Sequence, residues 1–390
     1  MRPAIRWDRK EISGSLGDLG TFIPLLVGMV TVCGLNAGSA LFFAGLFNVI
    51  TGLTFGLPMA VQPMKAIAAI AISEGLTPAQ IAAAGILTSA VILILGLTNW
   101  ISRLDRIIPM SVVRGLQLAV GLTLLFKGIR LIAGTGILIG YDSILTGLLG
   151  GGLVLVLFFS DRFPGALWIF LIGLGLLALE SPELFASLRL DFSLPRWTPP
   201  AWGDFLAGGE RAALAQIPLT LLNSVIAVCA LSRDLFPACP ATPRRVSISV
   251  GGMNLIAGWF GAMPMCHGSG GLAGQYRFGA RSGGSVIFLG GIKIALGCLL
   301  GTALMPILAA YPESILGVLL VFSGMELSLI TRDVKDRNSA FVMFLTASTS
   351  LALHSLAIGF VLGWVLSLLF LRGIIRTGPD APGNHSRSEP

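Results

Sequence analysis

A short passage occurs twice in this chain, once in each half. Residues 47–52 read Phe-Asn-Val-Ile-Thr-Gly, and residues 253–258 read Met-Asn-Leu-Ile-Ala-Gly. In both copies a Pro-Met pair follows, beginning ten residues after the asparagine, at residues 58–59 and 264–265. Each copy begins as an apolar helix, which the glycine and the proline then interrupt. Paired interruptions in the two halves of a membrane chain indicate the place where a transporter binds its substrate.

The composition places these interrupted segments in a membrane. Of the 390 residues, 54% are hydrophobic and 12% are charged, whereas a soluble domain has about 25% charged residues. The apolar runs are continuous rather than alternating, which excludes the strands of an outer-membrane barrel. We therefore expect an all-α polytopic membrane protein. The net charge of +7 does not indicate nucleic acid binding, because the basic residues lie mainly in short loops and tails.

The apolar runs predict about fourteen transmembrane segments. Their approximate bounds are 13–33, 39–57, 63–75, 78–98, 107–126, 143–160, 164–180, 212–231, 246–262, 268–279, 284–305, 312–330, 338–353 and 355–372. Segments 3 and 10, at 63–75 and 268–279, are too short to cross a hydrocarbon core, which requires about 20 helical residues. We interpret each of them as an extended stretch followed by a half-helix.

The duplication extends beyond the first passage. Ile-Pro-Leu occurs at residues 23–25 and 217–219, and Pro-x-Ser occurs at 109–111 and 312–314. Seven segments in each half is an odd number, so the second half enters the membrane upside down, as an inverted repeat. The predicted parts are a first repeat (1–180, segments 1–7), an external connecting loop (181–211), a second repeat (212–376, segments 8–14) and a disordered tail (377–390).

Basic residues predict the orientation in the membrane. The regions that this arrangement places outside hold only Lys127, Arg130, Arg189, Arg196 and Arg211, whereas the inside regions hold most of the others. Because basic loops stay in the cytoplasm, both termini are expected there. No obvious cleavage site follows the polar residues 1–11, so we expect no cleaved signal peptide. The predicted location is the inner (plasma) membrane of a bacterium.

The two half-helices predict an anion site. A helix that begins inside the membrane points its free N–H groups and positive dipole end at the interruption. Pro63 suits the first turn of the first half-helix because it has no N–H to leave unpaired, and residues 268–271, Gly-Ser-Gly-Gly, allow close approach at the second. Lys65 adds a full charge, which favours a dianion such as a tetrahedral oxyanion. Alternatively, Lys65 reaches the interface or pairs with Asp18.

Other polar residues extend this prediction. Asn223 and Ser224 lie inside an apolar span, where they either donate hydrogen bonds to a substrate or pack helices together. Asp18 either carries a coupling proton or caps a helix at the interface. His267 either titrates near neutral pH or is structural. The predicted substrate-binding residues are Thr21, Gln62, Pro63, Lys65, Asn223, Ser224, His267, Gly268, Ser269 and Gly270, with Asp18 and His267 as candidates for proton coupling.

The sequence predicts neither an enzyme nor a metal or cofactor site. The five cysteines are scattered without a Cys-x-x-Cys pair, so we interpret them as small packing residues. No spacing supports a nucleophile–base pair. Arg114, Lys293 and Glu326 are interpreted as inter-helix pairs or interface residues rather than ligands.

Four passages resemble the molybdate transporter family that is related to the SulP sulfate permeases. They are Gly14 through Pro24, Phe47 through Lys65 with its Gln62-Pro63-Met64-Lys65, Pro218 through Ser224, and Pro264 through Arg281 followed by Ser282. The resemblance implies a seven-plus-seven inverted-repeat fold shared with nucleobase permeases. Segments 1–4 and 8–11 would form a moving core, and segments 5–7 and 12–14 a gate. We expect two departures from the sulfate permeases, namely no C-terminal STAS domain and a glycine, Gly271, where many of them carry a basic residue.

The resemblance also implies a function. The chain would import molybdate as a secondary active transporter, by an elevator-like movement and with protons as a possible coupling ion, and would hold the anion between segments 3 and 10. The alternatives are a transporter of sulfate or another oxyanion, and an anion channel of the same fold. The expected partners are molybdate, tungstate or sulfate, protons, the lipid bilayer and a second copy in a homodimer.

Overall fold

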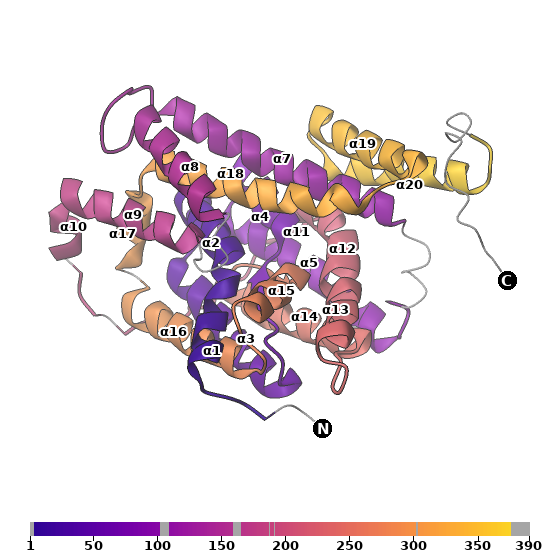
Figure 1. The fold of residues 1–390 in the computed structure, drawn as a ribbon, viewed down its shortest axis with the longest axis horizontal. Coiled ribbons are helices and arrows are strands. Elements are labelled where there is room, and N and C mark those ends of the chain that lie inside the picture. Colours follow the sequence, from indigo (N-terminus) through magenta and orange to yellow (C-terminus); the bar gives the residue numbers. More distant parts are fainter. Residues whose placement is uncertain are drawn as a thin grey trace.

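Helices form nearly all of the structure, a computed structural model that describes residues 4–101, 109–158, 165–186, 188–190, 192–301 and 303–375 (Figure 1). The predicted disordered tail, 377–390, lies outside the described residues. In the first half the elements are α1 (Arg9–Ser15), η1 (Leu16–Asp18), α2 (Leu19–Cys33), α3 (Ala37–Phe55), β1 (Val61–Pro63), α4 (Lys65–Glu74), α5 (Pro78–Leu97), α7 (Met110–Gly134), α8 (Ile144–Phe158), α9 (Gly165–Glu180) and α10 (Pro182–Ala186).

The second half has a corresponding series of elements. They are α11 (Trp202–Gly208), η2 (Gly209–Ala213), α12 (Leu214–Leu219), η3 (Thr220–Ile226), α13 (Ala227–Leu235), α14 (Pro243–Ala257), η4 (Gly258–Phe260), β2 (Met265–His267), α15 (Ser269–Arg277), α16 (Gly284–Leu300), α17 (Leu304–Ala309), α18 (Glu313–Leu329), η5 (Ile330–Asp333), α19 (Arg337–Ala352) and α20 (Leu356–Leu371). The segments η2 and η3 are π-helical turns.

The predicted helical, polytopic class is confirmed. Among the described residues, six helices are long and apolar enough to cross a membrane: Arg9–Cys33, Ala37–Phe55, Pro78–Leu97, Met110–Gly134, Trp202–Leu235 and Glu313–Asp333. Every predicted apolar run overlaps at least one helix, while the total of fourteen spans stays a prediction. The predicted bounds differ most at the eighth run, where the helix ending at Leu235 begins at Trp202, inside the predicted connecting loop.

Local sequence signals fix where several helices begin and end. The α5 helix begins with a capping box, in which Thr77 and Gln80 each bond the other's backbone N–H, followed by Pro78 in the first turn. The α3 helix is capped at its N-terminus by Asn36, whose side chain accepts a hydrogen bond from the N–H of Ser39. It ends at Gly56, whose φ of 69° is a left-handed conformation that glycine adopts without strain.

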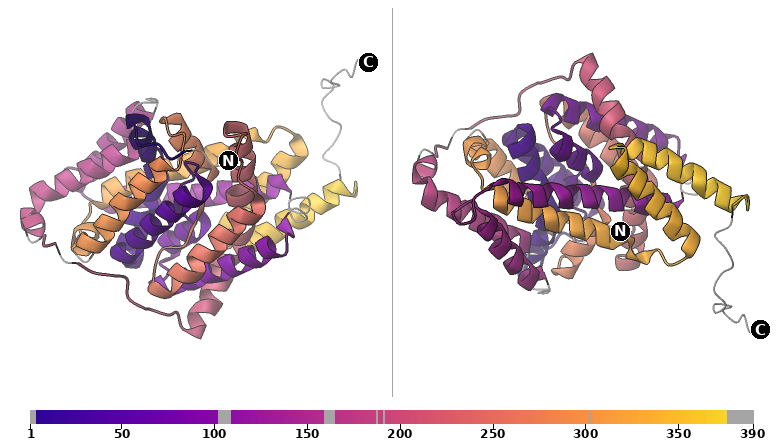
Figure 2. Two further views of the ribbon diagram at one scale, coloured as in Figure 1. Left: turned by 90° about the horizontal axis from the view of Figure 1, so that it is seen from below. Right: turned by 90° about the horizontal axis from the view of Figure 1, so that it is seen from above.

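The helices are arranged in two layers. In Figure 1 the helices α7, α8, α18, α19 and α20 lie along the top, and α7 and α18 pack side by side there. In the lower layer α3 packs on α16 and α5 packs on α14, and the two further views follow the same arrangement (Figure 2). A two-fold relation between the halves would exchange these last two pairs. The inverted-repeat division and the assignment of core and gate stay predictions.

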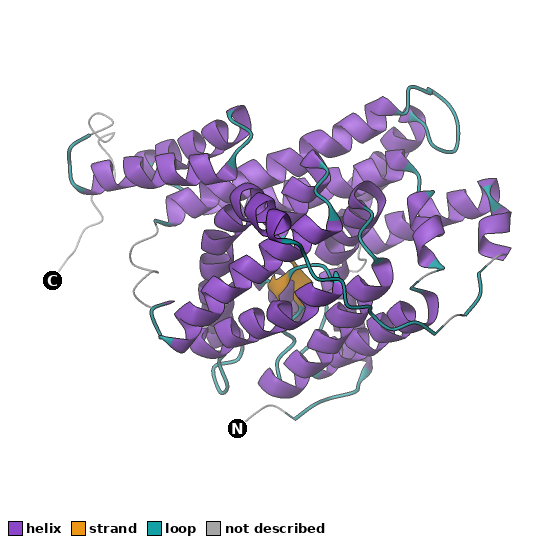
Figure 3. Cartoon of the chain, turned by 180° about the vertical axis from the view of Figure 1, so that it is seen from behind, coloured by secondary structure: helices purple, strands orange, loops and turns teal. Residues whose placement is uncertain are grey.

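A short strand pair lies among the helices, near the middle of Figure 3. Strands β1 and β2 are antiparallel, with Gln62 opposite Cys266 and Pro63 opposite Met265. Pro63 was expected in the first turn of a helix, but it lies in β1, and α4 begins two residues later. Proline is tolerated at this position because the N–H that it lacks would point away from the partner strand.

The repeated asparagines hold the outer edges of this strand pair. Asn48 accepts a hydrogen bond from the N–H of Val61 at 2.9 Å, and Asn254 accepts from the N–H of Met265 at 2.7 Å. Both bonds reach the first residue of a strand. Asparagine is therefore repeated because a buried side-chain amide replaces the missing neighbouring strand at each edge.

Candidate functional site

A small cavity lies between the two layers, beside the strand pair. Its lining residues are Gln62, Lys65, Gln117, Gln216, Leu219, Asn223, Ser224, Cys266, Gly268 and Leu327. Gln62 and Cys266 come from the two strands, and Gln117 and Leu327 come from α7 and α18 in the upper layer. We call this space the central cavity. A larger cavity adjoins it, since Lys65 and Leu327 line both.

The structure brings together half of the residues that the sequence singled out. Gln62, Lys65, Asn223, Ser224 and Gly268 line the central cavity. Thr21 and Gly270 line the larger cavity instead.

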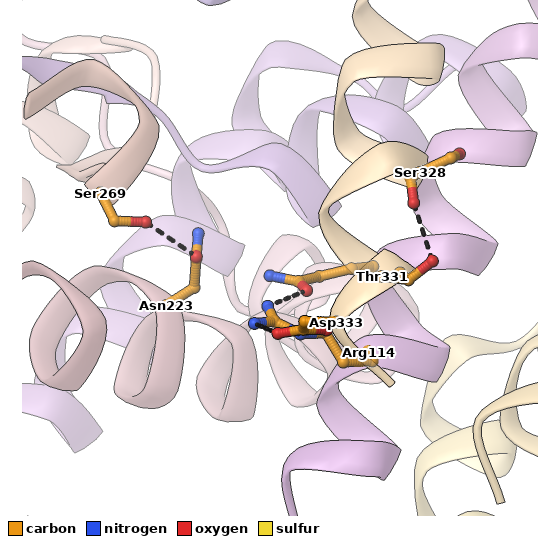
Figure 4. A network of polar contacts seen from close by, with 7 residues as sticks. Arg114, Asn223, Ser269, Ser328, Thr331 and Asp333 are labelled. Carbon is orange, nitrogen blue, oxygen red and sulfur yellow. Dashed lines mark hydrogen bonds and ion pairs between the residues drawn. The ribbon is translucent and has the colours of Figure 1, made fainter. Parts of the chain in front are cut away.

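Ser269 stands next to this group. Its hydroxyl donates to Asn223 Oδ1 at 3.2 Å (Figure 4). The Asn223 side chain lies on the π-helical turn η3, which follows Pro218. A proline inside a helix has no N–H to donate, and π-turns occur frequently at functional sites.

Two predicted residues point away from the central cavity. Successive side chains of a strand face opposite sides, so Pro63 faces away from Gln62 and His267 faces away from Cys266. His267 is fully buried, and its ring nitrogens lie 2.9 Å from Ser249 Oγ and 3.3 Å from the carbonyl oxygen of Ala60. The sequence analysis did not consider this alternation; neither residue lines the central cavity, and their role in substrate binding stays a prediction.

Asp18 is buried and interacts with two other side chains. It is 1% exposed, and its Oδ1 accepts a hydrogen bond from Gln62 Nε2 at 2.5 Å. Its Oδ2 lies 3.9 Å from Lys293 Nζ. The carboxylate makes no helix-capping hydrogen bond in the described structure. The alternative of an interfacial cap is therefore excluded, and Lys293 is an inter-helix ion-pair partner, as expected.

The two short helices differ at their N-termini. Gln216 Oε1 accepts from the N–H groups of Ala66 and Ile67, at 2.9 and 3.2 Å, and so caps α4. No described side chain caps α15, which begins after Gly268. Both termini were expected to be open to a ligand, but a side-chain oxygen already occupies the first. Donors remain at α15, where the first N–H groups of a helix have no intrahelical acceptor.

The upper layer contributes a polar group that the sequence analysis missed. Gln117 is 1% exposed, and its Oε1 accepts from Arg114 Nη1 at 2.8 Å. No hydrogen-bond partner for its Nε2 is found among the described residues. Arg114 in turn forms an ion pair with Asp333 (Figure 4). Gln117 and Gln216 share the signal that drew attention to Asn223, since both are polar residues inside a predicted apolar span.

Comparison with known proteins identifies the family. A sequence profile described as "Molybdate transporter of MFS superfamily" matches residues 10–124 and 210–327. The chain belongs to the molybdate transporter family. It is 43% identical to molybdate transporter 2 of Arabidopsis thaliana, over 92% of this chain and 86% of that protein. It is 39% identical to molybdate transporter 1 of Arabidopsis thaliana, over 95% and 90%. The resemblance inferred from the four passages is therefore confirmed, and the family is one of transporters rather than enzymes.

Solved structures confirm the related fold. The chain superimposes on SLC26A9 with a TM-score of 0.68 and 16% identity, over 95% of this chain and 66% of that one. It superimposes on the transmembrane domain of a cyanobacterial bicarbonate transporter, BicA, with a TM-score of 0.63 and 14% identity, over 90% and 97%. At such low identity the likeness concerns the fold alone. This member of the molybdate transporter family is an integral membrane protein with an SLC26-like fold.

One prediction about location finds no support. The two molybdate transporters of Arabidopsis thaliana are from a plant, and a third relative, 35% identical over 91% of this chain and 90% of that protein, is from the alga Chlamydomonas reinhardtii. Nothing in these relatives favours a bacterial inner membrane.

Proposed function

We propose that this chain is a secondary transporter that imports molybdate and holds it in the central cavity. The observation that carries the proposal is the convergence of three donors on one small space. Lys65 supplies an ammonium group, Gln117 an unpaired amide N–H, and α15 an uncapped N-terminus. A tetrahedral dianion accepts hydrogen bonds at every oxygen and gains from positive charge, so these groups match its chemistry.

The ammonium of Lys65 is the main source of charge in this proposal. No described residue forms an ion pair or hydrogen bond with its Nζ, although the acids Asp18 and Glu326 lie near enough to act on it electrostatically. A charged group inside a membrane protein normally has a partner. We infer that the bound anion supplies this partner.

The position of the cavity suits an elevator-like movement. Most of its lining comes from the lower layer, whereas Gln117 and Leu327 belong to the upper layer. We propose that the lower layer, with segments 1–4 and 8–11, carries the anion past an upper layer of segments 5–7 and 12–14. Gln117 would then contact the anion only while the central cavity lies next to α7.

Uptake into proteoliposomes tests the proposal. We expect saturable molybdate uptake that tungstate inhibits, and competition with sulfate measures how far the site discriminates between oxyanions. Failure of the purified protein to bind or move molybdate would refute the proposal. Flux that does not saturate would favour an anion channel.

The capping role of Gln216 gives a separate prediction. Gln216→Ala removes the acceptor of two buried N–H groups, which should lower the stability of the protein by about 1–3 kcal/mol. Because we place the anion at α15 and Lys65, the Kd for molybdate should change only a few fold. Thermal unfolding and isothermal titration calorimetry measure the two effects. A Kd that changes tenfold or more, in either direction, would instead place the anion on the N–H groups of Ala66 and Ile67.

Orientation and coupling complete the proposal. We propose that both termini are cytoplasmic, on the basis of the basic loops, and that a homodimer forms through the upper layer. Cysteine labelling from each side of the membrane tests the orientation.

We assign proton coupling to Asp18 rather than to His267, because His267 lines neither cavity and both of its ring nitrogens face protein oxygens.

A further inference from the structure

One side chain connects the buried acid to the central cavity. The Gln62 amide donates through Nε2 to Asp18 Oδ1 at 2.5 Å, and Gln62 also lines the cavity. Its other end, Oε1, is buried and has no hydrogen-bond donor in the described part of the chain. This oxygen lies beside Gly268, the residue that precedes α15.

An unpaired oxygen at this place opposes the binding of an oxyanion. Both are hydrogen-bond acceptors, so no bond can form between them, and their partial negative charges repel. The other end of the same amide is a donor. The cavity would therefore bind an oxyanion better if the amide were turned over.

The charge of Asp18 decides which end of the amide faces it. An ionised carboxylate only accepts hydrogen bonds and therefore holds the NH₂ end of Gln62. A protonated carboxyl donates its O–H to Oε1, and the amide then directs Nε2 toward the cavity. Glycines make room for the amide here. A Cβ on Gly271 would lie 2.8 Å from Gln62 Nε2 and 3.0 Å from Asp18 Oδ1.

The charges around Asp18 also link its protonation to the binding of an anion. Asp18 lies 3.9 Å from Lys293 of α16, and it interacts electrostatically with Lys65 of α4 and with the thiol of Cys266 in β2. Lys293 also lies over the ring of Phe22, at 3.5 Å from its centroid, which stabilises the ammonium by a cation–π contact. When Asp18 is ionised, the charges of Asp18, Lys65 and Lys293 sum to one positive charge. When Asp18 is protonated, the sum is two positive charges, which matches the charge of a dianion.

We propose that molybdate binds together with one proton, which resides on Asp18 and turns the Gln62 amide so that Nε2 donates to the anion. The proposal rests on the proposed function, since molybdate is its ligand. Gln62 is then the link between proton and anion, and Asp18 acts through it. Affinity must rise as the pH falls, because the protonated form is the one that binds.

Calorimetry on the purified full-length protein tests this directly. Titrations with sodium molybdate, in buffers of different ionisation enthalpy, count the protons taken up. We expect about one proton for each anion, and a Kd that falls about tenfold for each unit by which the pH falls while Asp18 is ionised in the empty protein. Glu326→Gln is the matched control, because it removes an acid that lines the larger cavity and should leave proton uptake unchanged.

Two variants separate the relay from simple electrostatics. In Asp18→Asn the new amide donates permanently to Gln62 Oε1, so proton uptake should vanish and, at high pH, binding should be tighter than in the wild type. In Gln62→Met the link is broken, and the pH slope of log Kd should fall well below that of the wild type. If Asp18→Asn does not fold because Lys293 loses its counter-ion, the double variant Asp18→Asn/Lys293→Met keeps the pH measurement possible, and its Kd should not depend on pH.

The outcomes distinguish this proposal from the proposed function. A wild-type protein that binds molybdate without proton uptake would overturn the relay and leave molybdate transport in place. A Gln62→Met variant with the slope of the wild type would show that the amide is not the link. A wild-type protein that does not bind molybdate would overturn both proposals.

Discussion

Replacing Lys65 by alanine should weaken molybdate binding by about a hundredfold or more, which corresponds to about 2.7 kcal/mol. The ammonium has no described ion-pair partner and lines both cavities. Its loss therefore removes a charge-assisted contact with the anion rather than a bond within the protein. Calorimetric titration with molybdate measures the effect, and uptake into proteoliposomes should fall in parallel.

Two further variants show whether the effect belongs to this position. Lys127→Ala removes a basic residue of α7 that lines a different cavity, and it should leave the Kd within about threefold. Lys65→Arg keeps the charge but presents it on a wider, planar group, so it should recover only part of the affinity. An unchanged Kd in a Lys65→Ala protein that unfolds at the wild-type temperature would count against the proposed site.

Much of the fold could be predicted because the membrane imposes simple rules. Apolar runs, glycine and proline placed α3, α5 and α18 to within three residues of their observed ends. Because the runs at 63–75 and 268–279 are short, the sequence also predicted that α4 and α15 are shorter than the membrane-spanning helices. The helix that ends at Leu235 was predicted, but its first ten residues were not, because tryptophan, glycine and aspartate in its first turn resemble a loop.

The candidate site was less predictable because it depends on single-residue register and on distant contacts. Lys65 and Gly268 were found from charge and from the broken helices. The sequence did not indicate that Pro63 and His267 face away from the central cavity, because a strand of three residues is too short to reveal its alternation. Gln216 was missed as a helix cap because its two N–H partners lie 150 and 149 residues away in the chain. A local sequence pattern does not predict a hydrogen bond between residues so far apart in the chain.

The repeated asparagines should not contribute equally to stability, although the sequence makes them equivalent. Asn254→Ala removes three hydrogen bonds: with the N–H of Met265 at 2.7 Å, with its carbonyl oxygen at 2.6 Å and with the carbonyl oxygen of Val250 at 2.9 Å. Two buried backbone groups of β2 then lose their partner, which should cost about 2–5 kcal/mol. Equilibrium unfolding in mixed micelles measures this loss.

Asn48→Ala is the matched control within the same protein. Asn48 accepts one hydrogen bond from Val61, and its buried Nδ2 has no partner in the described structure. Its removal also relieves that unpaired donor, so it should cost only about 1 kcal/mol. Molybdate binding should follow the same order, because β2 leads directly into Gly268 and α15. Equal losses from the two variants would mean that the additional bonds of Asn254 do not stabilise β2, and that the two strand edges are held in the same way.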